Sequence, residues 1–129
     1  MRLLLDTHVL LWALNEPAIL SPAERNAIAD ESNSVAASVA SLWEIAIKQR
    51  SGKLKLPAPA ADWLPPLIDG SKFDTLNITR RHAFAAGALP AHHRDPFDRM
   101  LVAQALTDDF VLVTRDQALR RYGVSTFEN

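Results

Sequence analysis

Short apolar runs alternate along this chain with segments of helical periodicity, and this alternation constrains the fold more than any other feature. The run at 2–5 is apolar after its first residue and ends in polar Asp6 and Thr7, as in a strand buried on both faces. Further short runs predict strands at 34–37, 73–78, 110–113 and 124–127. This order predicts an α/β fold, a three-layer α/β/α sandwich with a mostly parallel central sheet.

Helix-start signals mark the segments between these runs. Ser21, Thr79 and Asp95 are typical N-caps, and a proline follows two of them at the first helical position. The predicted helices are 8–14, 22–31, 39–52, 59–68, 80–87, 96–107 and 114–121. Apolar residues at 39, 42, 43, 46 and 47 define the stripe of the third helix. We expect the fourth helix to bend or break at Pro65-Pro66.

The length and composition suit one domain over residues 1–129. The chain is 48% hydrophobic, which is enough for a single core, and it has no repeat or Gly/Ser linker. It has no cysteine, which excludes thiol catalysis and disulfide scaffolds. Asp6 and His8 interrupt the apolar N-terminus before it reaches the length of a signal-peptide core or a membrane span, so we expect a soluble, cytoplasmic protein with no membrane partner.

Four acidic residues follow predicted strands or lie early in predicted helices: Asp6, Glu44, Asp98 and Asp116. They can therefore lie at one end of the sheet, where parallel α/β folds bind ligands. Each also has a local explanation, because acids are common at caps and in first turns. Asp6 and Asp116 can cap helices, and residues 41–44 match a capping box that ends in Glu44.

Asp98 is the most informative of the four acids. Leu101, Val102 and Ala105 lie three, four and seven residues after it, on the same helical stripe. A carboxylate on a buried face needs a hydrogen-bonding partner or a cation. Several converging acids repel one another unless a cation neutralises them, and hard oxygen ligands indicate Mg²⁺ or Mn²⁺.

Four segments carry a family pattern: LLLDTHVLLWAL at 3–14, SLWEIAIKQRSGKL at 41–54, HHRDPFDRMLVAQAL at 92–106 and LVTRDQAL at 112–119. They resemble the PIN-domain ribonucleases and, within them, the VapC-type toxins of toxin–antitoxin pairs. The resemblance implies a metal-dependent endoribonuclease toxin whose catalytic acids and Mg²⁺ or Mn²⁺ ligands are Asp6, Glu44, Asp98 and Asp116. It implies supporting roles for Asp95, Thr7 and Thr114.

The implied reaction is in-line hydrolysis of the RNA backbone, which leaves a 5′-phosphate and a 3′-hydroxyl. A ribonuclease that used histidine and the ribose 2′-hydroxyl would instead leave a 2′,3′-cyclic phosphate. His92 and His93 are the histidines that suggest such chemistry, or a transition-metal site. We interpret both as loop residues before a helix, because isolated histidine pairs are weak motifs.

The net charge of −1 conceals basic residues that suit an RNA partner. Without the four acids named above, 14 basic residues stand against 11 acidic ones, a remainder of +3. The candidate phosphate-binding residues are Lys48, Arg50, Lys53 and Lys55, which cluster after Glu44, together with Arg94 and Arg99 beside the DPFD motif. For the cluster, a solvated helix end is an equally good explanation.

Other functions fit the acids less well. A phosphate-accepting receiver domain needs an adjacent acidic pair early in the chain, and a haloacid-dehalogenase phosphatase needs an aspartate where His8 stands. A non-catalytic PIN-like binding module is the remaining alternative. Metal-dependent cleavage of RNA would distinguish the enzyme from the module.

The resemblance also implies a VapB-like antitoxin and a homodimer. The candidate apolar surface for both comprises Val9, Leu10, Trp12, Ala13, the Ile19-Leu20 turn and Trp43. Packing in the core is the alternative for each tryptophan.

Overall fold

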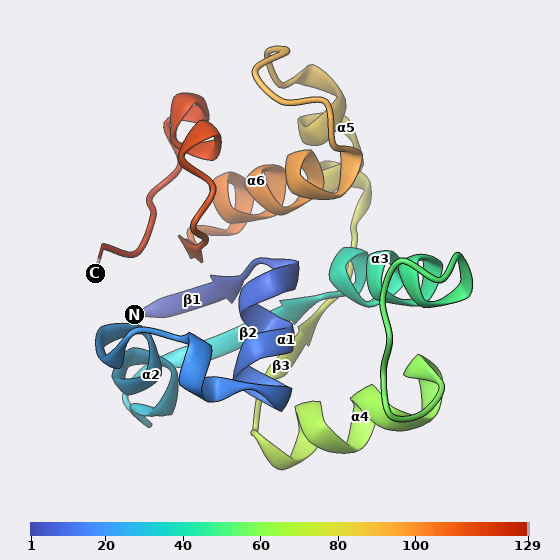
Figure 1. Ribbon diagram of the computed structural model, residues 1–129. Helices are drawn as coiled ribbons and strands as arrows, with labels where there is room; N and C mark the ends of the chain where they lie inside the picture. Colours follow the sequence, from blue (N-terminus) through green and yellow to red (C-terminus); the bar gives the residue numbers. More distant parts are fainter. Residues whose placement is uncertain (129) are drawn as a thin grey trace.

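A computed structural model describes residues 1–128 and contains one parallel sheet of four strands in the order β3-β2-β1-β4 (Figure 1). The strands are β1 (Arg2–Leu5), β2 (Ser34–Ser38), β3 (Asp74–Leu76) and β4 (Val111–Val113). In β1, one of the two inner strands, Leu4 lies opposite Ala36 of β2 on one side and Leu112 of β4 on the other. The parallel sheet confirms the predicted α/β class.

Helices connect these strands and cover the sheet. They are α1 (Thr7–Asn15), α2 (Pro22–Ala29), α3 (Val39–Arg50), α4 (Ala60–Gly70), α5 (Arg80–Ala88) and α6 (Pro96–Asp108), with the 3₁₀ helices η1 (Pro17–Ile19) and η2 (Gln117–Tyr122). The predicted caps Ser21, Thr79 and Asp95 each accept a backbone hydrogen bond from the first turn of their helix. Among the described residues, no helix combines the length and the apolar content needed to cross a bilayer.

The alternating side chains of β1 divide the interior into two cores, one on each face of the sheet. Leu3 and Leu5 pack with Leu10 of α1 and Leu64 of α4. Leu4 points to the other face and packs with the residues of α6 and η2. The three leucines are completely buried, so helices cover β1 on both faces, as the sandwich requires.

Three predicted elements differ in the structure. Helix α4 continues through Pro65 and Pro66, because Leu64 and Ile68 are buried in one core on either side of the prolines. The strand expected at 124–127 is reduced to one bridge, between Leu112 and Thr126, beside the end of β4. The helix expected at 114–121 is the 3₁₀ helix η2.

Helix α3 buries the face opposite to the predicted apolar stripe. Its buried residues are Ala40, Ser41, Glu44 and Ile45. Trp43 is 61% exposed and Ile47 is 42% exposed. Ser38, the last residue of β2, caps α3 directly, so the strand-to-helix junction sets the rotation of the helix and turns Glu44 inward. The periodicity therefore located the helix correctly, but its apolar stripe is not the buried face.

Candidate active site

Four carboxylates from four different elements converge at the carboxyl end of the sheet. They form what we call the four-acid site: Asp6 after β1, Glu44 in α3, Asp98 in the first turn of α6 and Asp116 after β4. Asp98 is close enough to Asp6 and Glu44 for both to act on its charge. His93 links Asp98 to Asp116. The topology thus brings together acids that are up to 110 positions apart in the sequence.

Asp6 is a helix cap and a member of this site at once. Its carboxylate accepts a hydrogen bond from the backbone N–H of Val9 at 2.9 Å, which confirms the capping interpretation. The side chain is 7% exposed, and burial raises the pKa of its carboxyl, while the Thr114 hydroxyl and the Val9 N–H act in the opposite direction. A cap alone does not require burial, so the local explanation does not account for the whole environment of Asp6.

Glu44 is held by hydroxyl and ammonium groups rather than by a capping box. Thr7 Oγ1 donates to Glu44 Oε1 at 2.6 Å and lies 3.0 Å from Ser41 Oγ. Lys48 Nζ donates to Glu44 Oε2 at 2.6 Å. The capping-box interpretation of 41–44 is wrong, because Ser38 is the cap and Ser41 already lies inside the helix. Ser41 also lies beside the site. Its i, i+3 spacing places it on the same side of the helix as Glu44, but the sequence did not indicate its contact with Thr7.

Asp98 has the most strongly shifted pKa of the four-acid site. Burial, followed by the neighbouring charge of Asp95, raises the pKa of its carboxyl from 3.8 to about 7, and His93 opposes this rise. Asp95 caps α6 by accepting from the backbone N–H groups of Phe97 and Asp98. Asp95 therefore has the cap position expected from the sequence, and its charge also raises the pKa of Asp98 directly.

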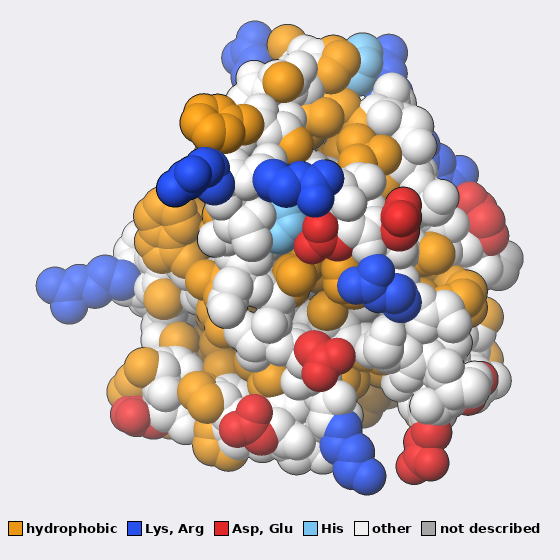
Figure 2. Space-filling view, turned by 180° about the vertical axis from the view of Figure 1, so that it is seen from behind, with side chains coloured by type: hydrophobic (Ala, Val, Ile, Leu, Met, Phe, Trp, Pro, Cys, Tyr) orange, Lys and Arg blue, Asp and Glu red, His pale blue; other side chains and the backbone are white. Residues whose placement is uncertain are grey.

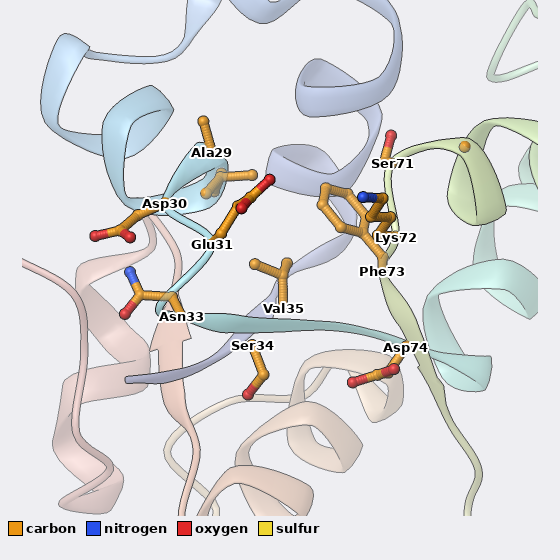
Figure 3. A pocket seen from close by; sticks show the side chains of 12 residues that line it. Ala29, Asp30, Glu31, Asn33, Ser34, Val35, Ser71, Lys72, Phe73 and Asp74 are labelled. Carbon is orange, nitrogen blue, oxygen red and sulfur yellow. The ribbon is translucent and has the colours of Figure 1, made fainter.

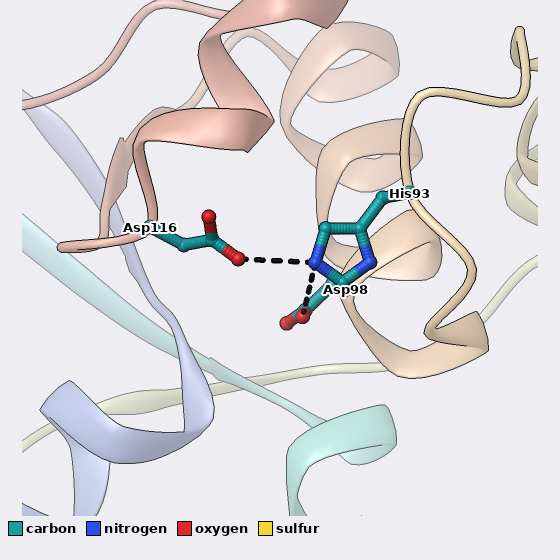
Figure 4. A group of neighbouring side chains, drawn as sticks. All are labelled: His93, Asp98 and Asp116. Atoms are coloured by element: carbon teal, nitrogen blue, oxygen red, sulfur yellow. Dashed lines mark hydrogen bonds and ion pairs between the residues drawn. The ribbon is translucent and has the colours of Figure 1, made fainter.

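His93 reaches into the site from the loop before α6 (Figure 4). Its Nε2 atom lies 3.0 Å from Asp116 Oδ2 and 3.5 Å from Asp98 Oδ2. These three side chains form a cluster with potential metal-ligand atoms close together. His92 instead packs edge-on against Tyr122, with ring centroids 5.1 Å apart. Both histidines are loop residues, as expected. The sequence spacing did not indicate that His93, rather than His92, contacts the acids.

The predicted phosphate-binding residues have different environments. Arg50, Lys53, Lys55 and Arg94 are exposed, whereas Lys48 pairs with Glu44. The Arg99 guanidinium donates to the backbone carbonyls of Ala86, Leu89, Pro90 and His93. These contacts hold Arg99 against the α5–α6 loop, so phosphate binding by Arg99 stays a prediction that its structural role competes with. Figure 2 shows basic and acidic side chains interspersed on the back of the molecule, with no continuous basic area there.

The candidate apolar surface near the N-terminus is largely core. Val9 and Leu10 are fully buried, and Leu20 is 3% exposed. Trp12 is half-buried, and the Cζ atom of Arg115 lies over its indole, 4.6 Å from the ring centroid. Trp43 is exposed and contacts Phe97 edge-on at a centroid distance of 5.4 Å. The exposed part of the candidate surface is therefore Trp43 together with Ile19, which is 41% exposed.

A cavity of about 460 Å³ lies at the other end of the sheet, where β2 and β3 begin (Figure 3). Its lining includes Asp30, Glu31, Lys72 and Asp74, which carry charges of both signs. No residue of the four-acid site lines it. This cavity is therefore separate from the four-acid site.

Comparisons with known proteins agree on one family. The model described as PIN domain matches residues 3–124. Ribonuclease VapC22 from Mycobacterium tuberculosis is 35% identical over 120 residues, which are 92% of this chain and 90% of the relative. Two solved structures share the fold: VapBC2 from Rickettsia felis bound to a promoter DNA fragment (TM-score 0.73, 19% identity, covering 100% of this chain and 98% of that chain) and DNA-bound VapBC from Salmonella typhimurium (TM-score 0.67, 18% identity, covering 99% and 97%).

Proposed function

The chain belongs to the PIN-domain family as a VapC-type endoribonuclease, and we propose that its four-acid site hydrolyses RNA with a bound Mg²⁺ or Mn²⁺ ion. The convergence of four carboxylates, with Asp6 and Glu44 less than a tenth exposed, carries this proposal. We further propose that residues 1–129 form a single PIN domain that acts as a toxin in the cytoplasm, where cellular RNA lies.

The donor set suits a hard divalent cation. All four acids offer carboxylate oxygens, which are the protein ligands that Mg²⁺ and Mn²⁺ prefer. Burial is the main cause of the raised pKa values of Asp6 and Asp98, so their ionised forms are poorly solvated in the protein. A divalent ion would supply positive charge beside them, lower the pKa of a water ligand and neutralise charge on the scissile phosphate.

The protein orients these ligands through its own hydrogen bonds. Thr7 fixes one oxygen of Glu44, and the Thr114 hydroxyl bonds to Asp6, so both buried carboxylates are positioned by elements of the sheet edge. The Lys48 ammonium lies beside Glu44 and is partly exposed. In this position it can bind a phosphate oxygen of RNA, while Arg50, Lys53 and Lys55 hold the flanking backbone.

End-labelled RNA incubated with Mg²⁺, Mn²⁺ or EDTA tests the proposal. We expect cleavage only with the divalent ion, and products that carry a 5′-phosphate and a 3′-hydroxyl. Cyclic 2′,3′-phosphate ends, or cleavage that persists in EDTA, would contradict the metal-dependent hydrolysis. The absence of cleavage under every metal condition would favour the non-catalytic binding module.

We propose that a VapB-like antitoxin inhibits this enzyme, and the structural relatives that are VapBC complexes support this partner. Its tail needs apolar contacts near the N-terminal helices and a basic group at the acids. A cavity of about 300 Å³ lined by Ala13, Pro17, Ile28 and Phe73, among others, offers the apolar contact.

We also propose a homodimer through the exposed face of α3. Small apolar cavities of about 290 and 190 Å³ flank Trp43, so an indole protruding from one copy can enter a cavity of the other in a two-fold arrangement. Sedimentation should show a dimer for the wild type and a monomer for Trp43→Glu. Phe84→Glu on α5, where the phenyl ring is 73% exposed, is the control that should remain dimeric. A dimeric Trp43→Glu variant would contradict this interface.

A further inference from the structure

The imidazole of His93 lies in the gap between two acids that would bind the metal ion. Its Nε2 atom is within 3.0 Å of Asp116 Oδ2 and 3.5 Å of Asp98 Oδ2 (Figure 4). These acids come from separate elements, α6 and the cap of η2. The position invites two roles: His93 is either a further ligand of the ion or a group that the ion must displace.

The other ring nitrogen decides between these roles. His93 Nδ1 accepts the backbone N–H of Asp95 at 3.0 Å, so in the neutral ring the proton resides on Nε2. A histidine that ligates a metal usually donates its second ring N–H to an acceptor, which fixes a free lone pair toward the metal. Here the second nitrogen faces a donor, and the Nε2–H group points at the carboxylates. The observed hydrogen bonds therefore make His93 a donor to the acids.

The loop that carries His93 is fixed from behind. The guanidinium of Arg99 donates to carbonyl oxygens at both ends of this loop, including Leu89 at 3.0 Å, Pro90 at 2.9 Å and His93 itself at 3.5 Å. Arg99 therefore stabilises the loop that positions the imidazole beside the acids. Displacement of the imidazole requires the side chain to rotate or the loop to move.

Local contacts fix the backbone of both acids without His93. Asp116 Oδ1 accepts the N–H of Ala118 at 3.0 Å, and its own N–H donates to Thr114 Oγ1 at 3.1 Å. Asp98 is held by the first turn of α6. Without His93 the two carboxylates would lose the Nε2 donor, so removal of the imidazole exposes this pair of acids to a cation.

We propose that His93 is a displaceable occupant of the four-acid site, whose N–H group holds the place of the divalent ion and competes with it. The inference rests on the proposed metal site. Binding of the ion would break the hydrogen bond from Nε2 to Asp116 and the 3.5 Å contact with Asp98, and their loss would subtract from the affinity for the ion. His93 thereby sets how much free metal the enzyme needs before it can act.

Calorimetric titration of the metal-free protein with Mn²⁺ tests the competition. His93→Phe keeps the ring shape and removes the donor, and we expect it to bind Mn²⁺ about tenfold more tightly, the equivalent of one hydrogen bond to a charged acceptor. His92→Phe is the matched control, because His92 packs on Tyr122, and its affinity should equal that of the wild type. His93→Ala carries the same expectation if the phenyl ring prevents folding.

Thermal unfolding supplies a second measurement that a purely structural role would not reproduce. Relative to the wild type, His93→Phe should unfold at a lower temperature without metal, because the acids lose their donor. With saturating Mn²⁺ its melting temperature should equal or exceed that of the wild type. A merely structural role of His93 would lower both melting temperatures.

The possible outcomes separate this inference from the proposed function. Weaker Mn²⁺ binding by His93→Phe and His93→Ala would show that the imidazole is a ligand, and unchanged binding would show that it is a bystander; either result overturns the inference and leaves the metal site intact. If neither the wild type nor the His93 variants bind Mn²⁺, the metal site itself is wrong and the inference falls with it.

Discussion

Burial makes the ionised form of Asp98 unfavourable in the metal-free protein. Its carboxyl has a pKa of about 7 in the folded state and about 3.8 in the unfolded chain. Between these values the folded state binds a proton that the unfolded state does not, so the free energy of unfolding should fall as the pH rises from about 4 to about 7. For this one group the free energy of unfolding changes by at most about 1.4 kcal/mol per pH unit. Urea denaturation in EDTA measures it.

The variant Asp98→Asn is the control for this pH dependence. The amide cannot ionise, so the decline in stability across the same pH range should become shallower. The raised pKa of Asp6 contributes a decline of the same sign in both proteins. A wild-type stability that rises steadily from pH 4 to pH 7 would show that the Asp98 carboxylate is not destabilised by its surroundings.

Replacement of Asp6 by Asn should abolish RNA cleavage without unfolding the protein. The change removes a proposed metal ligand, and it also removes a buried charge near Glu44. The asparagine oxygen can still accept the Val9 N–H at the helix cap. Product formation and the metal-free melting temperature are the measurements, and the latter should stay level or rise. Cleavage at a near-normal rate, or loss of activity that results from unfolding, would contradict the assigned role.

At the scale of the elements, Arg99 connects α6 to the loop that follows α5. Arg99→Gln should lower the free energy of unfolding by about 2 kcal/mol, because several backbone carbonyls of the α5–α6 segment, most of them partly buried, lose a charged donor. The salt dependence of RNA binding by the folded variant should not change. A flatter salt slope with unchanged stability would keep Arg99 in the phosphate-binding set that its position beside the DPFD motif suggested.

The exposed basic residues after α3 should behave in the opposite way. Replacement of Arg50, Lys53 and Lys55 by Gln removes exposed charges that form no ion pair among the described residues, so each change should alter stability by less than about 0.5 kcal/mol. RNA affinity should fall similarly for all sequences, and the slope of log affinity against log salt should flatten by about 0.7 for each lost single-strand phosphate contact. An unchanged slope would identify the cluster as an ordinary solvated helix end.

At the scale of the whole molecule, the proposed antitoxin and the metal ion should compete for the acids. A basic side chain of the antitoxin tail that enters the four-acid site supplies the same positive charge as the ion. Antitoxin affinity measured as Mn²⁺ is titrated should therefore fall. Tight binding that is indifferent to Mn²⁺, and that persists after the basic residues of the tail are replaced, would show that inhibition does not require occupation of the acids.

Local signals predicted most elements of the fold because they act over a few residues. The caps at Ser21, Thr79 and Asp95 and the buried run at 2–5 each depend on neighbouring backbone groups. Several differences concern side chains whose partners belong to other elements. Nothing near Arg99 in the sequence indicates that four backbone carbonyls surround its guanidinium, and nothing near His93 indicates that its ring meets Asp116.

The sequence by itself determined the alternation of strands and helices, and with it the end of the sheet at which Asp6 and Asp116 emerge, because a parallel sheet places every strand terminus on a predictable edge. Only the tertiary structure decided which face of α3 is buried. A stripe of apolar residues favours burial, but the cap at the end of β2 turns the helix so that Ile45 fills the core and Glu44 faces the acids. Trp43 is left exposed because the rotation of a helix is set by the packing of the whole sheet edge and not by its own periodicity.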